Sequence, residues 1–100
     1  MGNKLFIYGT LTKPEIQKDI FGRVVNGTSD ALHGYKRSKI KIDGEIYPLI
    51  IPDKDGKILG LVIEISDDEL NRADKYETEG YQRINVILES GIFGWVYVKR

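Results

Sequence analysis

Two short segments, far apart in the chain, carry the groups best suited to chemistry. In the first, Tyr8-Gly9-Thr10-Leu11, an apolar stretch breaks at a glycine just before a helix-like pattern. Consecutive backbone N–H groups at such a strand-to-helix junction can bind an anion or a polarised carbonyl. In the second, residues 74–83, carboxylates and aromatic rings are interleaved between a helix end and a strand start. Carboxylates are among the side chains that accept and donate protons during reactions.

Each segment also has an ordinary structural interpretation. Many strand-to-helix turns contain glycine, so the first segment by itself is weak evidence for a binding site. The second segment, taken alone, is more typical of a charged loop on the surface. The two segments therefore indicate a site only if the elements between them bring them together.

Hydrophobic periodicity and turn residues predict about six strands and two short helices. Two capping boxes, Thr12 with Glu15 and Ser66 with Glu69, are expected to open the helices. Gly22 is expected to end the first helix, and the second should run to about Lys75. The expected strands are residues 4–9, 30–42, 45–51, 57–65, 81–88 and 92–98.

Turn residues join the expected strands. Pro52 closes the third strand, and Asp55-Gly56 is a strong hairpin signal between the third and fourth strands. Ser90-Gly91 is expected to form a closing hairpin between the last two strands. A chain of 100 residues is long enough for one domain, so residues 1–100 are interpreted as a single domain. The expected strands and helices place this domain in the α+β class.

The composition excludes several kinds of site. With no cysteine, the chain has no disulfide, no thiolate nucleophile and no zinc–thiolate site. His33 is the only histidine, so a metal site with several histidines is excluded. No serine or cysteine motif lies near His33 for it to serve as a base, which favours a surface or partly buried histidine.

The charge balance narrows the partners. Fifteen basic residues match fifteen acidic ones, so no overall field attracts nucleic acid or anionic lipid. A basic cluster beside Tyr35, residues 36–41, alternates with Ile40 and Ile42 and is interpreted as the solvated face of a strand. The longest apolar stretches fall far short of the ~20 residues that a membrane span needs. Since the N-terminal segment lacks the pattern of a secretion signal, the expected location is the cytoplasm.

Three motifs together resemble the gamma-glutamylcyclotransferase-like family, which includes the gamma-glutamylamine cyclotransferases. Tyr8-Gly9-Thr10-Leu11 resembles its opening Tyr-Gly-Ser/Thr-Leu, and Tyr47-Pro48-Leu49-Ile50 resembles its Tyr-Pro-apolar stretch. Its Leu…Asp-x-aromatic-Glu…Tyr-x-Arg segment is matched by Leu70, Asp74, Tyr76, Glu77, Tyr81 and Arg83. The sequence departs from the family at Ala73, where Leu is usual, and at Thr78, where Gly is common.

The resemblance implies a small mixed β-barrel flanked by short helices, with a cavity at one end. It also implies a cyclotransferase that acts on a small γ-glutamyl amine or peptide without metal or cofactor. The α-amine of the γ-glutamyl group attacks its own side-chain carbonyl and releases 5-oxoproline and a free amine. Glu77 is then the expected catalytic base, and the expected substrate-binding residues are Tyr8, Gly9, Thr10, Leu11, Tyr47 and Tyr81.

Glu77 is preferred to Glu79 as the base because only Glu77 follows an aromatic residue in the family-like arrangement. Burial beside Tyr76 and Tyr81 should raise the pKa of its carboxyl. Two alternatives stay open. One is a relative that binds a small metabolite without chemistry, and the other, less favoured, is an RNA-binding barrel that uses residues 35–41.

Overall fold

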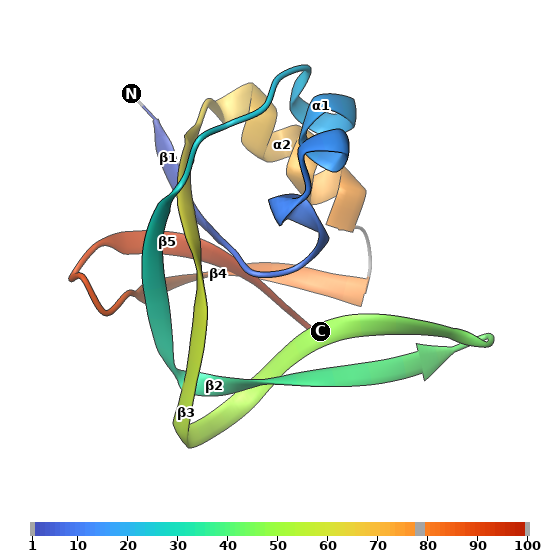
Figure 1. The fold of residues 1–100 in the computed structure, drawn as a ribbon, viewed down its shortest axis with the longest axis vertical. Coiled ribbons are helices and arrows are strands. Elements are labelled where there is room, and N and C mark those ends of the chain that lie inside the picture. The colour runs from blue at the N-terminus through green and yellow to red at the C-terminus, as the bar shows by residue number, and fades with distance from the viewer. Residues whose placement is uncertain (1, 78–79, 100) are drawn as a thin grey trace.

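The computed structural model describes residues 2–77 and 80–99 of the chain. Its strands form one curled sheet, a half-barrel, and its two α-helices pack together on one side of that sheet (Figure 1). The elements in chain order are β1 (Asn3–Ile7), the short 3-10 helix η1 (Thr10–Thr12), α1 (Pro14–Phe21), β2 (Thr28–Ile42), β3 (Glu45–Ile65), α2 (Asp67–Glu77), β4 (Tyr81–Ile87) and β5 (Phe93–Lys99).

The sheet is mixed, with the strand order β2-β3-β1-β5-β4. Its central strand β1 runs antiparallel to β3 and parallel to β5, where Leu5 lies opposite Trp95. Leu5, Phe6 and Ile7 are all buried, so β1 is covered on both faces, as its unbroken apolar run predicts. Leu5 and Ile7 pack with the helices, whereas Phe6 packs in the second cluster on the opposite face.

The prediction of six strands is wrong by one, because the third and fourth expected strands are a single strand, β3. The hairpin predicted at Asp55-Gly56 is absent. Instead, β3 pairs with β2 on both sides of this point, with a register shift between His33 and Tyr35. Residues 53–56 of β3 bulge opposite Gly34 of β2, and both strands bend there together (Figure 1).

Glycine makes this corner possible on both strands. Gly34 has a φ of +89°, in the region that favours glycine. At Gly56, a Cβ atom would lie 2.2 Å from the carbonyl oxygen of Tyr35. The backbone N–H of Asp55 donates to Oδ1 of Asp53, 3.1 Å away, which is the local hydrogen bond of a turn. The turn signal in the sequence is therefore real, but it bends the chain without reversing it.

The reversal occurs at Asp43-Gly44, where both residues have positive φ, 51° and 84°. Beyond the corner, β2 and β3 form a two-stranded arm, residues 35–52, that projects from the rest of the sheet (Figure 1, green). The hydroxyl of Tyr81, at the start of β4, donates to the Pro48 carbonyl of this arm at 2.8 Å. The arm is thereby fastened to the opposite edge of the half-barrel.

Helix α1 begins later than the sequence predicts. The hydroxyl of Thr12 donates to the Gly9 carbonyl at 2.6 Å, because Thr12 belongs to η1. The capping box of Thr12 with Glu15 is therefore wrong, and α1 starts at Pro14 without a side-chain cap. The predicted end at Gly22 is confirmed, since Gly22 is the C-cap residue with a φ of +74°.

The capping box of α2 is confirmed. The N–H of Ser66 donates to Oε1 of Glu69 at 2.9 Å, and the N–H of Glu69 donates to the Ser66 hydroxyl at 3.1 Å. Glu69 is buried and also accepts two hydrogen bonds from the Arg23 guanidinium, at 2.9 and 3.0 Å. These bonds, with Arg23 the largest cause, lower the pKa of Glu69 to about 2. Neither helix in the described part of the chain is long and apolar enough to cross a membrane.

Replacing this carboxylate should weaken the fold and change its response to acid. Because the pKa of Glu69 is lowered from 4.5 to about 2, its stabilising effect is full above pH 4.5 and disappears towards pH 2. We expect Glu69→Gln to lower the free energy of unfolding by about 1–2 kcal/mol at pH 7. The difference from the wild type should shrink as the pH falls through this window.

Urea unfolding between pH 7 and pH 2.5 measures this effect. Glu64→Gln is the matched control, since Glu64 makes an exposed ion pair with Lys4, which contributes little. A constant difference between Glu69→Gln and the wild type across this pH range would contradict the prediction.

Candidate functional site

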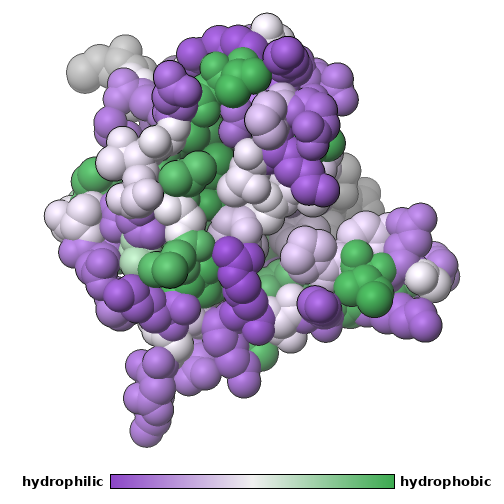
Figure 2. Space-filling model, viewed as in Figure 1, coloured by the Kyte–Doolittle hydropathy of each residue, from purple (hydrophilic) through white to green (hydrophobic). Residues whose placement is uncertain are grey.

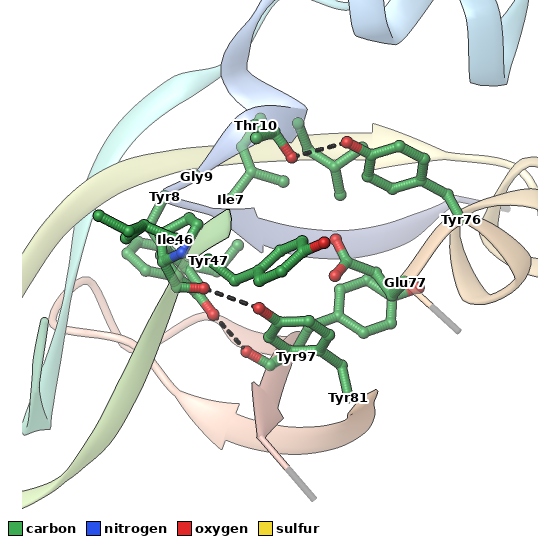
Figure 3. A pocket seen from close by; sticks show the side chains of 13 residues that line it. Ile7, Tyr8, Gly9, Thr10, Ile46, Tyr47, Tyr76, Glu77, Tyr81 and Tyr97 are labelled. Carbon is green, nitrogen blue, oxygen red and sulfur yellow. Dashed lines mark hydrogen bonds between the residues drawn. The ribbon is translucent and has the colours of Figure 1, made fainter. Parts of the chain in front are cut away.

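A cavity of about 440 Å³ opens where the β1–η1 loop, the arm, the end of α2, the start of β4 and the end of β5 approach one another (Figure 3). All seven residues that the sequence singles out for catalysis or substrate binding line it. The lining consists of Phe6, Ile7, Tyr8, Gly9, Thr10, Leu11, Ile46, Tyr47, Pro48, Tyr76, Glu77, Tyr81 and Tyr97.

The Tyr8–Leu11 segment forms one wall and is held from behind. Leu11 is buried, and its carbonyl accepts a hydrogen bond of 2.8 Å from the side chain of Gln17. The same buried side chain accepts a hydrogen bond of 2.9 Å from the N–H of Val25. Neither the N–H of Gly9 nor that of Thr10 donates to another residue in the described part of the chain. These two donors are therefore available to a ligand.

Arg37 fixes the direction of this peptide from outside the cavity. Its guanidinium donates to the carbonyls of Tyr8, at 2.8 Å, and Leu59, at 3.1 Å, and lies 5.9 Å from the Tyr8 ring centre. In a trans peptide the C=O and the following N–H point in opposite directions. By holding the Tyr8 carbonyl, Arg37 also sets the direction of the Gly9 N–H. No pattern in the sequence indicates this role, because Arg37 lies in a run of exposed basic residues.

Glu77 is the last residue of α2, and its side chain points into the cavity from the side opposite Gly9 (Figure 3). Its carboxyl makes no hydrogen bond with any residue that the structure describes. Burial raises the pKa of this carboxyl from 4.5 to about 7. Burial, followed by the charge of Glu77, also raises the pKa of Tyr8.

A neighbouring carboxylate, Asp74, lies one helical turn before Glu77 and has a different environment. It accepts two hydrogen bonds of 2.9 Å from the Arg83 guanidinium and one of 2.6 Å from the Tyr97 hydroxyl. These hydrogen bonds hold the pKa of Asp74 below its ordinary value despite its partial burial. Arg83 in turn stacks on the ring of Trp95, 4.1 Å from its centre. This network fixes the end of α2 on β4 and β5.

Tyrosine hydroxyls connect the remaining walls of the cavity. Tyr76 and Thr10 share a hydrogen bond of 2.9 Å, which joins α2 to η1 (Figure 3). Tyr8 donates to the Tyr97 carbonyl at 2.6 Å. The rings of Tyr47 and Tyr81 complete the side formed by the arm and β4. Of these residues, Tyr97 has no distinguishing signal in the sequence beyond its place in an alternating strand.

His33 is exposed, and its Nε2 atom lies 2.8 Å from Oε1 of Glu89, away from the cavity. No group of three or more His, Cys, Asp or Glu residues within 2–77 and 80–99 could hold a metal ion. Thr78 and Glu79 lie outside the described residues, so the choice of Glu77 over Glu79 as the base stays a prediction.

Known proteins resemble this chain over nearly its whole length. The family model described as "Gamma-glutamyl cyclotransferase, AIG2-like" matches residues 5–100. AIG2-like protein C of Arabidopsis thaliana is 41% identical over 83 residues, covering 82% of this chain and 47% of the relative. Protein AIG2 C of the same plant is 38% identical, covering 84% of this chain and 50% of the relative. The chain thus spans about half the length of the curated relatives it matches.

Solved structures share the fold. A solution structure of an Arabidopsis thaliana protein is 30% identical to this chain, with a TM-score of 0.80. The match covers 99% of this chain and 62% of the chain of that structure. The structure of a gamma-glutamyl cyclotransferase matches with a TM-score of 0.84, and the match covers 100% of this chain and 68% of the chain of that structure. It is 16% identical, so it supports the fold alone. On the match over residues 5–100, the chain belongs to the AIG2-like gamma-glutamyl cyclotransferase family.

Proposed function

We propose that this protein is a cyclotransferase that releases 5-oxoproline from a small γ-glutamyl amine or peptide. The observation that carries the proposal is the position of Glu77. Its carboxyl, with a pKa raised to about 7, lies in one cavity with the N–H groups of Gly9 and Thr10, which donate to no other residue that the structure describes. Membership of the AIG2-like gamma-glutamyl cyclotransferase family supports this reaction class. We further propose that the protein works in the cytoplasm.

In the proposed reaction, the α-amine nitrogen forms a bond to the γ-carbonyl carbon, and the bond from that carbon to the leaving nitrogen breaks. Two protons leave the α-ammonium nitrogen, and two reach the leaving nitrogen, so no outside proton is needed. Glu77 would carry them, first as a base towards the α-ammonium and then as an acid towards the departing amine. Since nucleophile and carbonyl belong to one molecule, the enzyme does not have to bring two reactants together.

The raised pKa of Glu77 and the backbone N–H donors of the cavity suit this proposed proton transfer. A carboxyl with a pKa of about 7 is present in both protonation states near neutral pH, so it can serve as base and acid in turn. Negative charge develops on the γ-carbonyl oxygen during the attack. The N–H group of Gly9, held in direction by Arg37, and the N–H group of Thr10 would donate hydrogen bonds to that oxygen. Tyrosine rings line the cavity around them, and both effects would be stronger where a bound substrate excludes water.

Removing the carboxylate tests the proposed base. Glu77→Gln keeps the size of the side chain but cannot accept a proton, so 5-oxoproline release from a panel of γ-glutamyl amines and dipeptides should fall by ~10²-fold or more. Glu15→Gln is the matched control, because Glu15 lies in α1 and does not line the cavity, and its activity should stay unchanged. Glu79→Gln should stay within a few-fold of the wild type.

The other outcomes are equally informative. Normal turnover by Glu77→Gln together with an inactive Glu79→Gln would assign the base to Glu79. Turnover by both variants would exclude a general base in this segment. If the wild type binds the γ-glutamyl compounds but releases no 5-oxoproline, the protein is a metabolite-binding relative. Retention of RNA that weakens with added salt would support the RNA-binding alternative instead.

The raised pKa of Glu77 can be checked without any substrate. Because its pKa is about 7 in the folded protein and 4.5 is its ordinary value, the folded state binds more protons between these values than the unfolded chain. The stability of the wild type should therefore fall by about 2–3 kcal/mol from pH 4.5 to pH 7 through this group and then level off. Glu77→Gln lacks this loss.

We expect Glu77→Gln to be more stable than the wild type at pH 8 and to lose this advantage near pH 4.5. Chemical unfolding of both proteins at several pH values measures the difference, with Glu15→Gln again as the control. Equal stability of Glu77→Gln and the wild type at pH 8 would show that the carboxyl ionises as readily as in water.

A further inference from the structure

A second cavity, of about 260 Å³, adjoins the first at the arm and shares Tyr47 and Tyr81 with it. The first cavity is lined with tyrosines, the backbone of the Tyr8–Leu11 segment and Glu77. The second is mainly apolar, with Ile40, Ile42 and Leu49 on the arm, and Lys99 is also among its lining residues. The two spaces therefore differ in the chemistry that they can recognise.

The arm presents its apolar side chains to this second cavity by strand geometry. Ile40 and Ile42 are two residues apart in β2, so they project from the same face of the arm. Ile42 is 48% exposed, and apolar surface is visible near the far end of the arm (Figure 2). An apolar group placed against these side chains would remove that surface from water.

Lys99 is the only charged residue among those described as lining the second cavity. It is exposed at the end of β5, and no carboxylate in the described part of the chain forms an ion pair with it. None of the residues described as lining this cavity is acidic. A ligand that carries a carboxylate next to an apolar group would match both features.

We propose that the second cavity is the subsite for the leaving group, and that it selects an amine with an aliphatic side chain and a carboxylate. This inference rests on the proposed function, since it takes the γ-glutamyl group to lie between Gly9 and Glu77. The leaving nitrogen then lies near the rings of Tyr47 and Tyr81, where the two cavities meet. The substrate class is a γ-glutamyl dipeptide whose second residue is aliphatic, with Ile40 and Ile42 against the side chain and Lys99 near the carboxylate.

Three matched substrates distinguish the contribution of the aliphatic chain from that of the carboxylate. γ-Glutamyl-leucine carries both features, γ-glutamyl-isopentylamine has the same aliphatic chain without the carboxylate, and γ-glutamylglycine has the carboxylate without the chain. We expect kcat/KM for the leucine compound to exceed that for the glycine compound by ~10-fold or more, as for other aliphatic subsites. We expect kcat/KM for the leucine compound to exceed that for the isopentylamine compound about threefold, because an ion pair at the surface contributes little.

Variants of the lining assign these preferences to the second cavity. Ile42→Glu should lower kcat/KM for the leucine compound to near that of the glycine compound, about a 10-fold loss. Lys99→Met should make the leucine and isopentylamine compounds equal. The matched controls are Ile87→Glu, at a 60% exposed isoleucine of β4, and Lys18→Met in α1, neither of which lines either cavity. Both controls should keep the wild-type preferences, and thermal unfolding checks that each variant is folded.

Equal kcat/KM for the three compounds, or the wild-type preferences retained in Ile42→Glu and Lys99→Met, would overturn the subsite. If the wild type turns over none of the three and none of the wider panel of γ-glutamyl amines and dipeptides, the proposed function fails, and equilibrium dissociation constants are measured for the same three compounds instead. The same order of preference in binding, lost in Ile42→Glu and Lys99→Met, would still support the subsite. Equal dissociation constants would overturn it as well.

Discussion

The carboxylate of Asp74 joins three elements of the fold at one point. It lies on α2, and its hydrogen bonds come from Arg83 on β4 and Tyr97 on β5. Because an α-helix is rigid over one turn, fixing Asp74 also fixes Glu77, three residues further along. The cavity wall opposite the glycine loop therefore depends on this partly buried ion pair. In the family-like motif, Asp74 and Arg83 hold the end of α2 on the sheet, while Glu77 faces the cavity.

Two carboxyls on the same helix are driven in opposite directions by their surroundings. Hydrogen bonds from Arg83 and Tyr97 keep the pKa of Asp74 low, and burial without such partners among the described residues raises that of Glu77 to about 7. Such a separation between neighbouring acids is common where one stays ionised and the other exchanges protons. The fold thus gives different environments to two residues that the sequence alone presents as members of one charged segment.

The sequence predicted the features that depend on local chemistry. The capping box at Ser66 and the buried strand β1 follow from near neighbours. At Asp55-Gly56 the turn residues were recognised, but whether the chain reverses or bends depends on Gly34 in the partner strand. The contact of Arg37 with the Tyr8 carbonyl is likewise set by distant packing. The meeting of Gly9 and Glu77 in one cavity was expected through the family resemblance, since no local pattern links segments so far apart.

Because of the glycine corner between the arm and the rest of the sheet, the position of the arm and the positions of Glu77 and the loop after β1 depend on different residues. The arm contributes Ile46, Tyr47 and Pro48 to the cavity, but the angle at which it approaches is set at Gly34 and residues 53–56. A bulge bends its strand and increases the local twist. A change in the bend at this corner would therefore alter the width of the cavity on the side of the arm, while Glu77 and the loop after β1 keep their positions. The width of the cavity and the arrangement of its polar groups can then vary independently.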